Sequence, residues 1–199
     1  MVRREGSRST KNLWIFCEGK KTETFYFKKL RHLERIDGLQ IKVFTSGNTD
    51  AVGIIEHAQK FIEHRKDYVE GDFVCCVFDR DQNQNSVLAQ AKRIAEQANI
   101  CLIFSNPCFE YWVLCHFGSF HSRYSPDDVI DKIKEYLPEY RKNDSETYSK
   151  VKEKTQIANN NAKVIHKKHI EKNVEIISCE SNPVTLVFHL IDKIFEFVR

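Results

Sequence analysis

Asp72–Asp81, with the sequence DFVCCVFDRD, predicts both the fold and the candidate site. Its residues Phe73 to Phe78 form an uninterrupted apolar run, which is typical of a central strand covered on both faces. Asp79 and Asp81 follow the carboxyl end of that strand, where open α/β sheets gather their ligands. Their i, i+2 spacing points both side chains the same way if the extended conformation persists. The pair is therefore a candidate site for a divalent cation.

The composition indicates one folded domain with no strong charge bias. The chain has 199 residues, and its 41% hydrophobic content is enough for a core. A net charge of +3 does not argue for nucleic-acid binding by itself, but basic residues gather near the N-terminus and between Lys150 and Lys172. A polyanion is therefore a permissible partner.

The cysteines and the chain termini bear on localisation. Seven cysteines are an odd number, and several lie in apolar runs where a free cysteine behaves as a small hydrophobe, which favours a reducing compartment. The N-terminus has no apolar core and hence no signal peptide. The late apolar stretch from Val184 to Val198 contains charged residues and falls short of the ~20 apolar residues that a membrane span requires. We expect a cytoplasmic protein that does not enter a membrane.

Hydrophobic periodicity predicts an α/β fold. Short apolar runs at 12–17, 39–44, 73–78 and 100–104 predict strands, and amphipathic helical patterns separate them. Connections this short favour parallel strands, right-handed crossovers and helices on both faces of the sheet. We therefore expect a three-layer α/β/α arrangement around a mainly parallel four-stranded sheet.

The rest of the chain is predicted to be an arm and a helical extension. Residues 1–11 are polar and basic, and we expect a flexible basic arm there. Residues 12–199 would form a single domain, with 106–199 as its mostly helical extension. Asn106 with Pro107, and Asn182 with Pro183, predict helix starts, and the last helix should pack back on the sheet.

Two further acids extend the candidate site. Glu18 follows the first predicted strand as Asp79 follows the third, so the two acids meet if those strands are neighbours. Clustered carboxylates repel one another, and Mg²⁺ or Mn²⁺ between them relieves that cost. Turn formation and helix capping remain the alternative for these acids. Glu110 lies in an apolar helical segment, where a carboxylate is usually paired or functional, and a partner such as Arg80 would make it structural.

Other catalytic classes find little support. The segment EGKKT, residues 18–22, resembles a phosphate loop but lacks the first glycine of the G-x-x-x-x-G-K-[ST] pattern. The chain has no G-x-S-x-G elbow, and no cysteine has a convincing local activating context, so acyl transfer is unsupported.

Four ordered motifs resemble a known family. They are WIFCEGKKTETFYF at 14–27, VFDRD at 77–81, SNPCFEYWVLCHF at 105–117 and SNPVTLVFHLID at 181–192. Together they resemble the RloB-like proteins, small relatives of the Toprim fold encoded in bacterial defence loci. In Toprim proteins a glutamate after the first strand and a D-x-D after a later strand bind Mg²⁺. The resemblance therefore implies a Toprim-like fold in which Glu18, Asp79 and Asp81 are metal ligands.

The resemblance implies phosphodiester chemistry or a regulatory role beside a partner ATPase. We expect a Mg²⁺- or Mn²⁺-dependent nuclease acting on DNA or RNA in anti-phage defence, with a partner ATPase encoded nearby. The alternative is a non-catalytic regulatory or binding module for that ATPase or for nucleic acid. The expected catalytic residues are Glu18, Asp79, Asp81, Glu110 and Lys142. The expected substrate-binding residues are Gly19, Lys20, Lys21, Thr22, Arg80 and Asn106.

Overall fold

The computed structural model describes residues 11–18, 22–48, 50–69 and 71–197. Most of the predicted basic arm, and the predicted substrate contacts of Gly19, Lys20 and Lys21, lie outside the described residues. Lys11, which we expected in the arm, is instead the first residue of strand β1. It is held there because its backbone N–H donates to the carbonyl of Gly38, 3.0 Å away.

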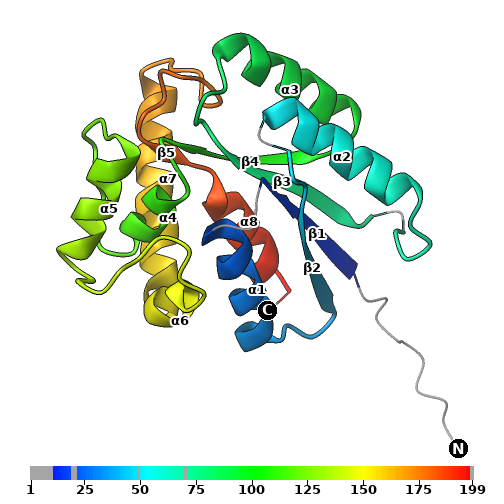
Figure 1. Cartoon of the computed structure of the whole chain (residues 1–199), viewed down its shortest axis with the longest axis horizontal. Coiled ribbons are helices and arrows are strands. Elements are labelled where there is room, and N and C mark those ends of the chain that lie inside the picture. Colours follow the sequence, from blue (N-terminus) through cyan, green and yellow to red (C-terminus); the bar gives the residue numbers. More distant parts are fainter. Residues whose placement is uncertain (1–10, 19–21, 49, 70, 198–199) are drawn as a thin grey trace, which may run out of the picture.

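A five-stranded sheet with the order β2-β1-β3-β4-β5 forms the centre of the molecule (Figure 1). Its strands are β1 (Lys11–Cys17), β2 (Leu39–Thr45), β3 (Phe73–Asp79), β4 (Cys101–Asn106) and β5 (Val184–Thr185). The first four are parallel, and β5 pairs antiparallel with β4. The prediction of a mainly parallel sheet is confirmed, but the count of four strands was wrong. With two residues, β5 is too short to leave a periodic pattern in the sequence.

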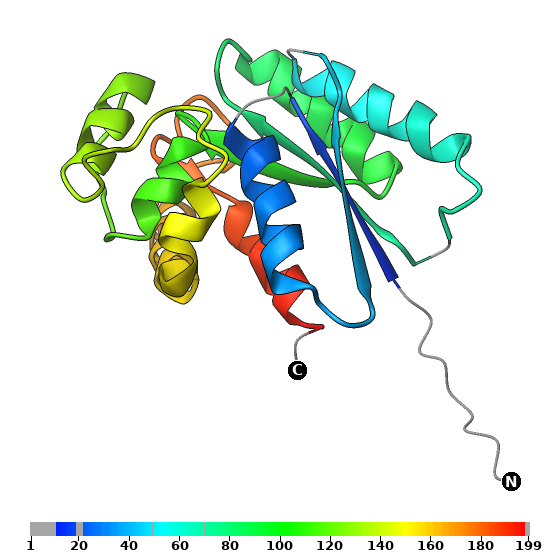
Figure 2. The same cartoon turned by 60° about the horizontal axis from the view of Figure 1, so that its bottom comes forward.

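Helices cover both faces of this sheet, as the short crossovers predicted (Figures 1 and 2). α2 (Ala51–Glu63) and α3 (Asn85–Gln97) lie side by side on one face, while α1 (Thr22–Glu34) and α8 (Val187–Phe195) cover the other. β3 lies between β1 and β4, and its residues from Val74 to Phe78 are buried. The three-layer α/β/α arrangement is confirmed.

The remaining helices form an extension beside β4 and β5 (Figure 1). They are α4 (Glu110–Cys115), α5 (Pro126–Lys134), α6 (Thr147–Val151), the 3₁₀ turn η1 (Lys152–Lys154) and α7 (Thr155–Glu171). α4 packs between α5 and α7 and contacts both β4 and β5. The extension therefore joins the sheet at the carboxyl end of β4.

Both predicted Asn-Pro helix starts were wrong by several residues. Asn106 is the last residue of β4, paired with Val184, and α4 begins only at Glu110. Asn182 likewise precedes β5 rather than a helix, and α8 begins at Val187. In both places, strand pairing of the backbone takes precedence over the capping tendency of the Asn-Pro dipeptide.

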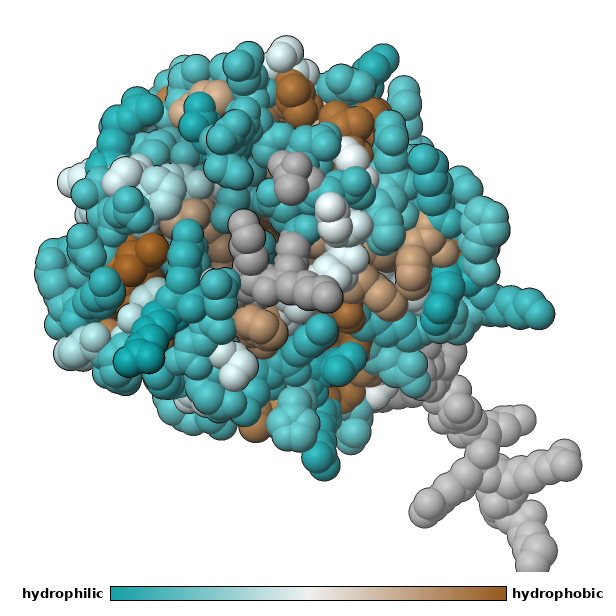
Figure 3. Space-filling model, in the orientation of Figure 1, coloured by the Kyte–Doolittle hydropathy of each residue, from teal (hydrophilic) through white to brown (hydrophobic). Residues whose placement is uncertain are grey.

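None of the described helices is long and apolar enough to cross a lipid bilayer. The face drawn in Figure 3 is mainly hydrophilic, and its hydrophobic residues form small separate groups.

Candidate active site

Strand order brings Glu18 and Asp79 to the same edge of the sheet. β1 and β3 are parallel neighbours in which Cys17 pairs with Val77, and the backbone N–H of Glu18 donates to the carbonyl of Val77 at 3.2 Å. From β1 the chain crosses to β2 on one side, whereas from β3 it crosses to β4 on the other. The carboxyl ends of β1 and β3 therefore flank the point where the crossovers diverge, which is the usual ligand crevice of open α/β sheets.

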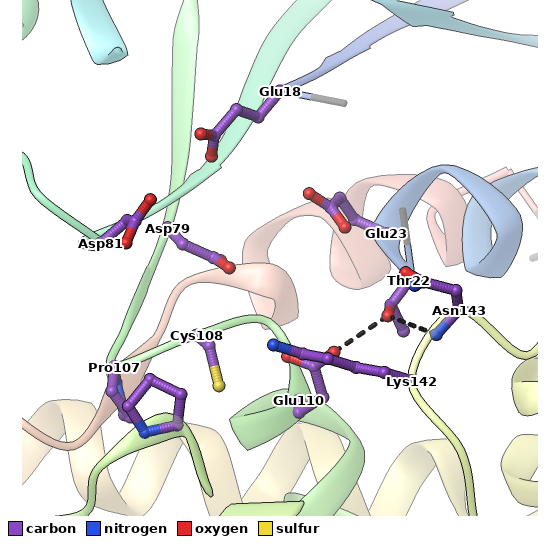
Figure 4. A pocket seen from close by; sticks show the side chains of 11 residues that line it. Glu18, Thr22, Glu23, Asp79, Asp81, Pro107, Cys108, Glu110, Lys142 and Asn143 are labelled. Carbon is purple, nitrogen blue, oxygen red and sulfur yellow. Dashed lines mark hydrogen bonds between the residues drawn. The ribbon is translucent and has the colours of Figure 1, made fainter. Parts of the chain in front are cut away.

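A pocket of about 200 Å³ opens at this edge. Its walls come from the ends of β1 and β3, the start of α1, the β4–α4 connection, α5 and the segment before α6. Figure 4 shows the carboxylates of Glu18, Glu23 and Asp79 pointing into the space between β3 and α1. The lining residues are Glu18, Thr22, Glu23, Asp79, Asp81, Pro107, Cys108, Glu110, Pro126, Lys142 and Asn143. Five of these eleven residues are acidic, so the pocket is built to attract positive charge.

Glu23 is the acid that the sequence analysis missed. It lies in the first turn of α1, and only 4% of it is exposed. An acidic residue in a first helical turn is commonly explained by its favourable interaction with the helix dipole. The only available signal was its position five residues after Glu18, and that spacing matches no helix or strand period.

Asp79 is an acid of this pocket whose charged form is strongly disfavoured by its surroundings. Burial raises the pKa of the Asp79 carboxyl well above its usual range, and the neighbouring Glu23, Glu110 and Glu18 raise it further. A hydrogen bond from the backbone of Phe109 opposes this shift without cancelling it. A group whose charged form is disfavoured by nearby carboxylates is one that a bound cation would stabilise.

Asp81 lines the pocket from a turn, a backbone conformation that the sequence did not predict. Its φ of 34° lies in the left-handed region, so the chain leaves the extended conformation between Asp79 and Asp81. The argument that alternation points both side chains the same way is therefore wrong, because β3 ends at Asp79. Asp81 nevertheless lines the pocket, through the turn rather than through the strand.

Thr22 joins Glu110 to the segment that carries Lys142. The Thr22 hydroxyl donates to Glu110 Oε1 at 2.9 Å, and the backbone N–H of Asn143 donates to that hydroxyl oxygen at 3.2 Å (Figure 4). Glu110 is only 3% exposed, and this hydrogen bond to Thr22 takes the place of the pairing with Arg80 that we considered. The link places Lys142 on the pocket wall beside Asn143.

Arg80 and Asn106, both predicted to bind substrate, are not among the residues that line the pocket. The Arg80 guanidinium donates to the backbone carbonyl of Asp81 at 2.9 Å and lies 3.6 Å from Cys179 Sγ. The Asn106 amide donates to the carbonyl of Ser178 at 3.1 Å, and Asn106 is only 2% exposed. Both side chains hold the segment 178–181 against the strand ends, which is a structural use.

The donor chemistry of the pocket suits a hard divalent cation. Carboxylate oxygens are the ligands that Mg²⁺ and Mn²⁺ prefer. Within the part of the chain that the structure describes, no three His, Cys, Asp or Glu side chains are close enough to hold a metal ion. The acids therefore line a pocket without forming a closed ligand cage. Glu18, Asp79 and Asp81 fit such a cation by donor type and by the raised pKa of Asp79.

Cys108 is the one thiol on the pocket wall. Burial raises its pKa well above the usual range, and the nearby Glu110 and Asp79 raise it further. The side chain is therefore a neutral thiol, which is a poor nucleophile. Covalent catalysis through this cysteine has no support in the geometry.

Comparison with known proteins gives one result. A family model described as RloB-like protein matches residues 13–194, which include nearly all of the sheet, the residues that line the pocket and the helices α4 to α7. No curated protein and no solved structure matches the chain.

Proposed function

This chain belongs to the RloB-like protein family, and from that membership we propose that it is a Mg²⁺- or Mn²⁺-dependent nuclease acting on DNA or RNA. The observation that carries the proposal is that Glu18, Glu23 and Asp79 line one pocket at the switch point of the sheet. An acidic pocket repels a phosphodiester unless a cation lies between them. Phosphodiester hydrolysis with a divalent ion is the chemistry that such a pocket serves best.

Several residues of the pocket have a proposed role. Glu18, Asp79 and Asp81 would hold the cation, which when bound supplies charge neutralisation and polarises a phosphoryl oxygen. Glu18 could alternatively act as the base that takes a proton from the attacking water. Lys142 would counter the negative charge that develops on the phosphate, and Thr22 would position it through Asn143.

The biological setting is also part of the proposal. We propose a cytoplasmic protein that acts in anti-phage defence with a partner ATPase. All seven cysteines are free, which supports a reducing compartment. The defence role and the partner follow from the resemblance to proteins encoded in bacterial defence loci.

Cleavage assays with charge-removing variants test the proposal. End-labelled single-stranded DNA, double-stranded DNA and tRNA are incubated with Mg²⁺ or Mn²⁺ and with the wild type, Asp79→Asn or Glu18→Gln. Asp131→Asn is the matched control, because its side chain is 79% exposed and does not line the pocket. We expect cleavage by the wild type and the control, and a loss of at least about 100-fold in both pocket variants.

Two outcomes would contradict the proposal in different ways. Cleavage that persists unchanged in Asp79→Asn and Glu18→Gln would refute the assignment of residues. An absence of cleavage on every substrate, with the partner ATPase present, would favour the non-catalytic binding module instead.

A further inference from the structure

A second pocket, of about 350 Å³, lies on the extension. It is formed by the last turns of α7, the segment that precedes α5 and the segment that precedes β5. His169 Nε2 donates to the carbonyl of Pro183 at 2.8 Å and so fixes α7 against the segment that precedes β5. The lining residues are His121, Arg123, Ile165, Lys168, His169, Lys172, Val174, Glu180, Asn182 and Pro183. None of them lines the acidic pocket.

The charge of this pocket is opposite to that of the acidic one. Arg123, Lys168 and Lys172 face a single carboxylate, Glu180. That carboxylate is already engaged, because the Asn85 amide donates to both of its oxygens at 3.1 Å. The lining therefore carries an excess of positive charge.

The lysines of α7 and its C-cap residue, Lys172, fall into two groups. Lys163 forms an ion pair of 2.7 Å with Asp192, and Lys167 forms one of 3.7 Å with Glu171. Lys168 and Lys172 line the pocket, and neither of them forms an ion pair with any described residue. The two lysines that line the pocket are thus the ones that form no ion pair with a carboxylate of α7 or α8.

His121 lies against the ammonium group of Lys168. Lys168 Nζ lies 3.1 Å from His121 Nε2 and 3.3 Å from Nδ1. Burial lowers the pKa of His121, and the positive charges of Lys168 and Lys172 lower it further. The neutral imidazole accepts a hydrogen bond from Lys168 but brings no negative charge, so the ammonium charge stays uncompensated and an anion beside it would be stabilised.

The helix dipole explains only part of this arrangement. Cations are favoured at the C-terminal end of a helix, and this accounts for Lys168 in the last turn of α7 and for its C-cap residue Lys172. It does not account for Arg123 and His121, which come from a separate segment to the same pocket. Cations gathered from two segments, facing one engaged carboxylate, are typical of an anion site.

The two pockets share a structural element. The segment 178–183 is held on one side by the Asn106 amide, which donates to the carbonyl of Ser178 at 3.1 Å. On the other side, Asn182 binds both the backbone N–H and the carbonyl of Tyr124, at 3.0 and 2.8 Å. This segment thus joins the end of β4, beside the acidic pocket, to a wall of the cationic one.

We propose that the pocket of Arg123, Lys168 and Lys172 binds a phosphate group, supplied by a polynucleotide backbone or by a free nucleotide. The backbone source rests on the proposed function, since it makes the pocket a second contact for a strand whose scissile bond lies in the acidic pocket. Three guanidinium and ammonium groups are donors suited to phosphate oxygens.

Binding assays without divalent metal test this proposal apart from cleavage. The affinity of a fluorescent single-stranded oligonucleotide is measured in EDTA at several salt concentrations, for the wild type and the double variant Lys168→Gln with Lys172→Gln. The matched control is Lys163→Gln with Lys167→Gln, which removes the same charge from neighbouring positions of α7 that do not line the pocket. Melting temperatures confirm that both variants fold. In the pocket variant we expect an affinity about tenfold lower than in the control. We also expect the slope of log K against log salt concentration to be smaller in magnitude by about one to two.

A second arm identifies the source of the phosphate. Adenosine monophosphate and inorganic phosphate are titrated against the same proteins, and chemical shifts of the His121 ring report occupancy. Weaker oligonucleotide binding in the pocket variant supports the backbone source. A loss of nucleotide or phosphate binding alone supports a free-nucleotide site. Equal behaviour of the two double variants in both arms would overturn the proposal, whatever the cleavage assays show.

Discussion

At the scale of single residues, the two ends of β3 hold carboxylates in opposite electrostatic states. Burial would raise the pKa of Asp72, but hydrogen bonds from Trp14, Asn12 and Val69 outweigh it and lower the pKa below its usual range. At the other end, burial and neighbouring acids raise the pKa of Asp79. The charge of Asp72 is therefore stabilised by hydrogen bonds within the fold, whereas the charge of Asp79 is disfavoured by its surroundings.

Asp79→Asn should stabilise the metal-free protein. The folded pKa of Asp79 lies above its ordinary value of 3.8, so its contribution favours folding at low pH and becomes unfavourable as pH rises above that value. Removing the charge should raise the free energy of unfolding at pH 7 by on the order of 1 kcal/mol, with a smaller gain at pH 4. Urea unfolding in EDTA at both pH values measures this. A variant less stable than the wild type at pH 7 would contradict the electrostatic account.

Asp72→Asn should have the opposite effect. The Asp72 carboxylate accepts hydrogen bonds of 3.0 Å from the Asn12 backbone and 2.9 Å from Trp14 Nε1, which join β1 to the start of β3. An Asn side chain replaces one carboxylate oxygen by an NH₂ group, which cannot accept from these N–H groups. We therefore expect the free energy of unfolding at pH 7 to fall by about 3 kcal/mol. Because the folded pKa is lowered, the contribution of Asp72 is present above pH 3.8 and is lost as pH falls through the folded pKa. Urea unfolding checks the loss, and Asp131→Asn, at an exposed position, should change stability by less than about 0.5 kcal/mol.

At the scale of elements, α1 links the sheet to the extension through its first residue. Thr22 contacts Glu110 of α4 and the backbone of Asn143 with one hydroxyl group. Thr22 therefore contributes to holding the segment 142–143, and with it Lys142, against α1. The first residue of α1 thus helps to position Lys142 and Asn143 on the other side of the pocket.

Thr22→Val tests that link with little change in volume. We expect amide hydrogen exchange at Asn143 to become about five- to tenfold faster, as the loss of one hydrogen bond implies. Cleavage should fall in parallel, while the melting temperature moves little. Thr22→Ser keeps the hydroxyl and should restore slow exchange, and an unchanged exchange rate in Thr22→Val would show that the link does not hold the segment.

The sequence predicted the elements that carry strong periodicity and missed the ones set by tertiary contacts. The apolar run at 73–78 identified β3, and the position of Glu18 after β1 predicted its meeting with Asp79. β5 was missed because it exists only by pairing with β4, and Glu23 was missed because its first-turn position has a common local explanation. The turn geometry of Asp81 depends on a positive φ, which no residue pattern around it signals.

At the scale of the whole molecule, the C-terminal part contributes a strand and a covering helix to the sheet. β5 closes the edge of β4, and the backbone N–H of Leu186 donates to the carbonyl of Phe104 at 2.8 Å. α8 then buries a row of apolar side chains against the sheet, namely Val187, Phe188, Leu190, Ile191 and Ile194. The sheet and the extension should therefore fold as one unit.

A chain ended after Asn173 should fail to fold. It loses β5 and the five buried apolar side chains of α8, each of which stabilises the fold by about 2 kcal/mol, against a total stability of about 5–15 kcal/mol. Circular dichroism and calorimetry measure the result, with a chain ended after Phe197 as the control. The control should unfold in one cooperative transition, and a cooperative transition in the shorter chain would contradict the single-unit account.

The central claim is that the acidic pocket binds a divalent cation through Asp79, and the shift in melting temperature between EDTA and Mn²⁺ tests it most directly. At a Mn²⁺ concentration 100 times the dissociation constant, binding adds about 2.7 kcal/mol to stability, which for a chain of this size is a shift of about 5–10 °C. We predict that shift for the wild type and for Asp131→Asn, and almost none for Asp79→Asn. Equal shifts in all three proteins would show that Mn²⁺ binds elsewhere and would contradict the account.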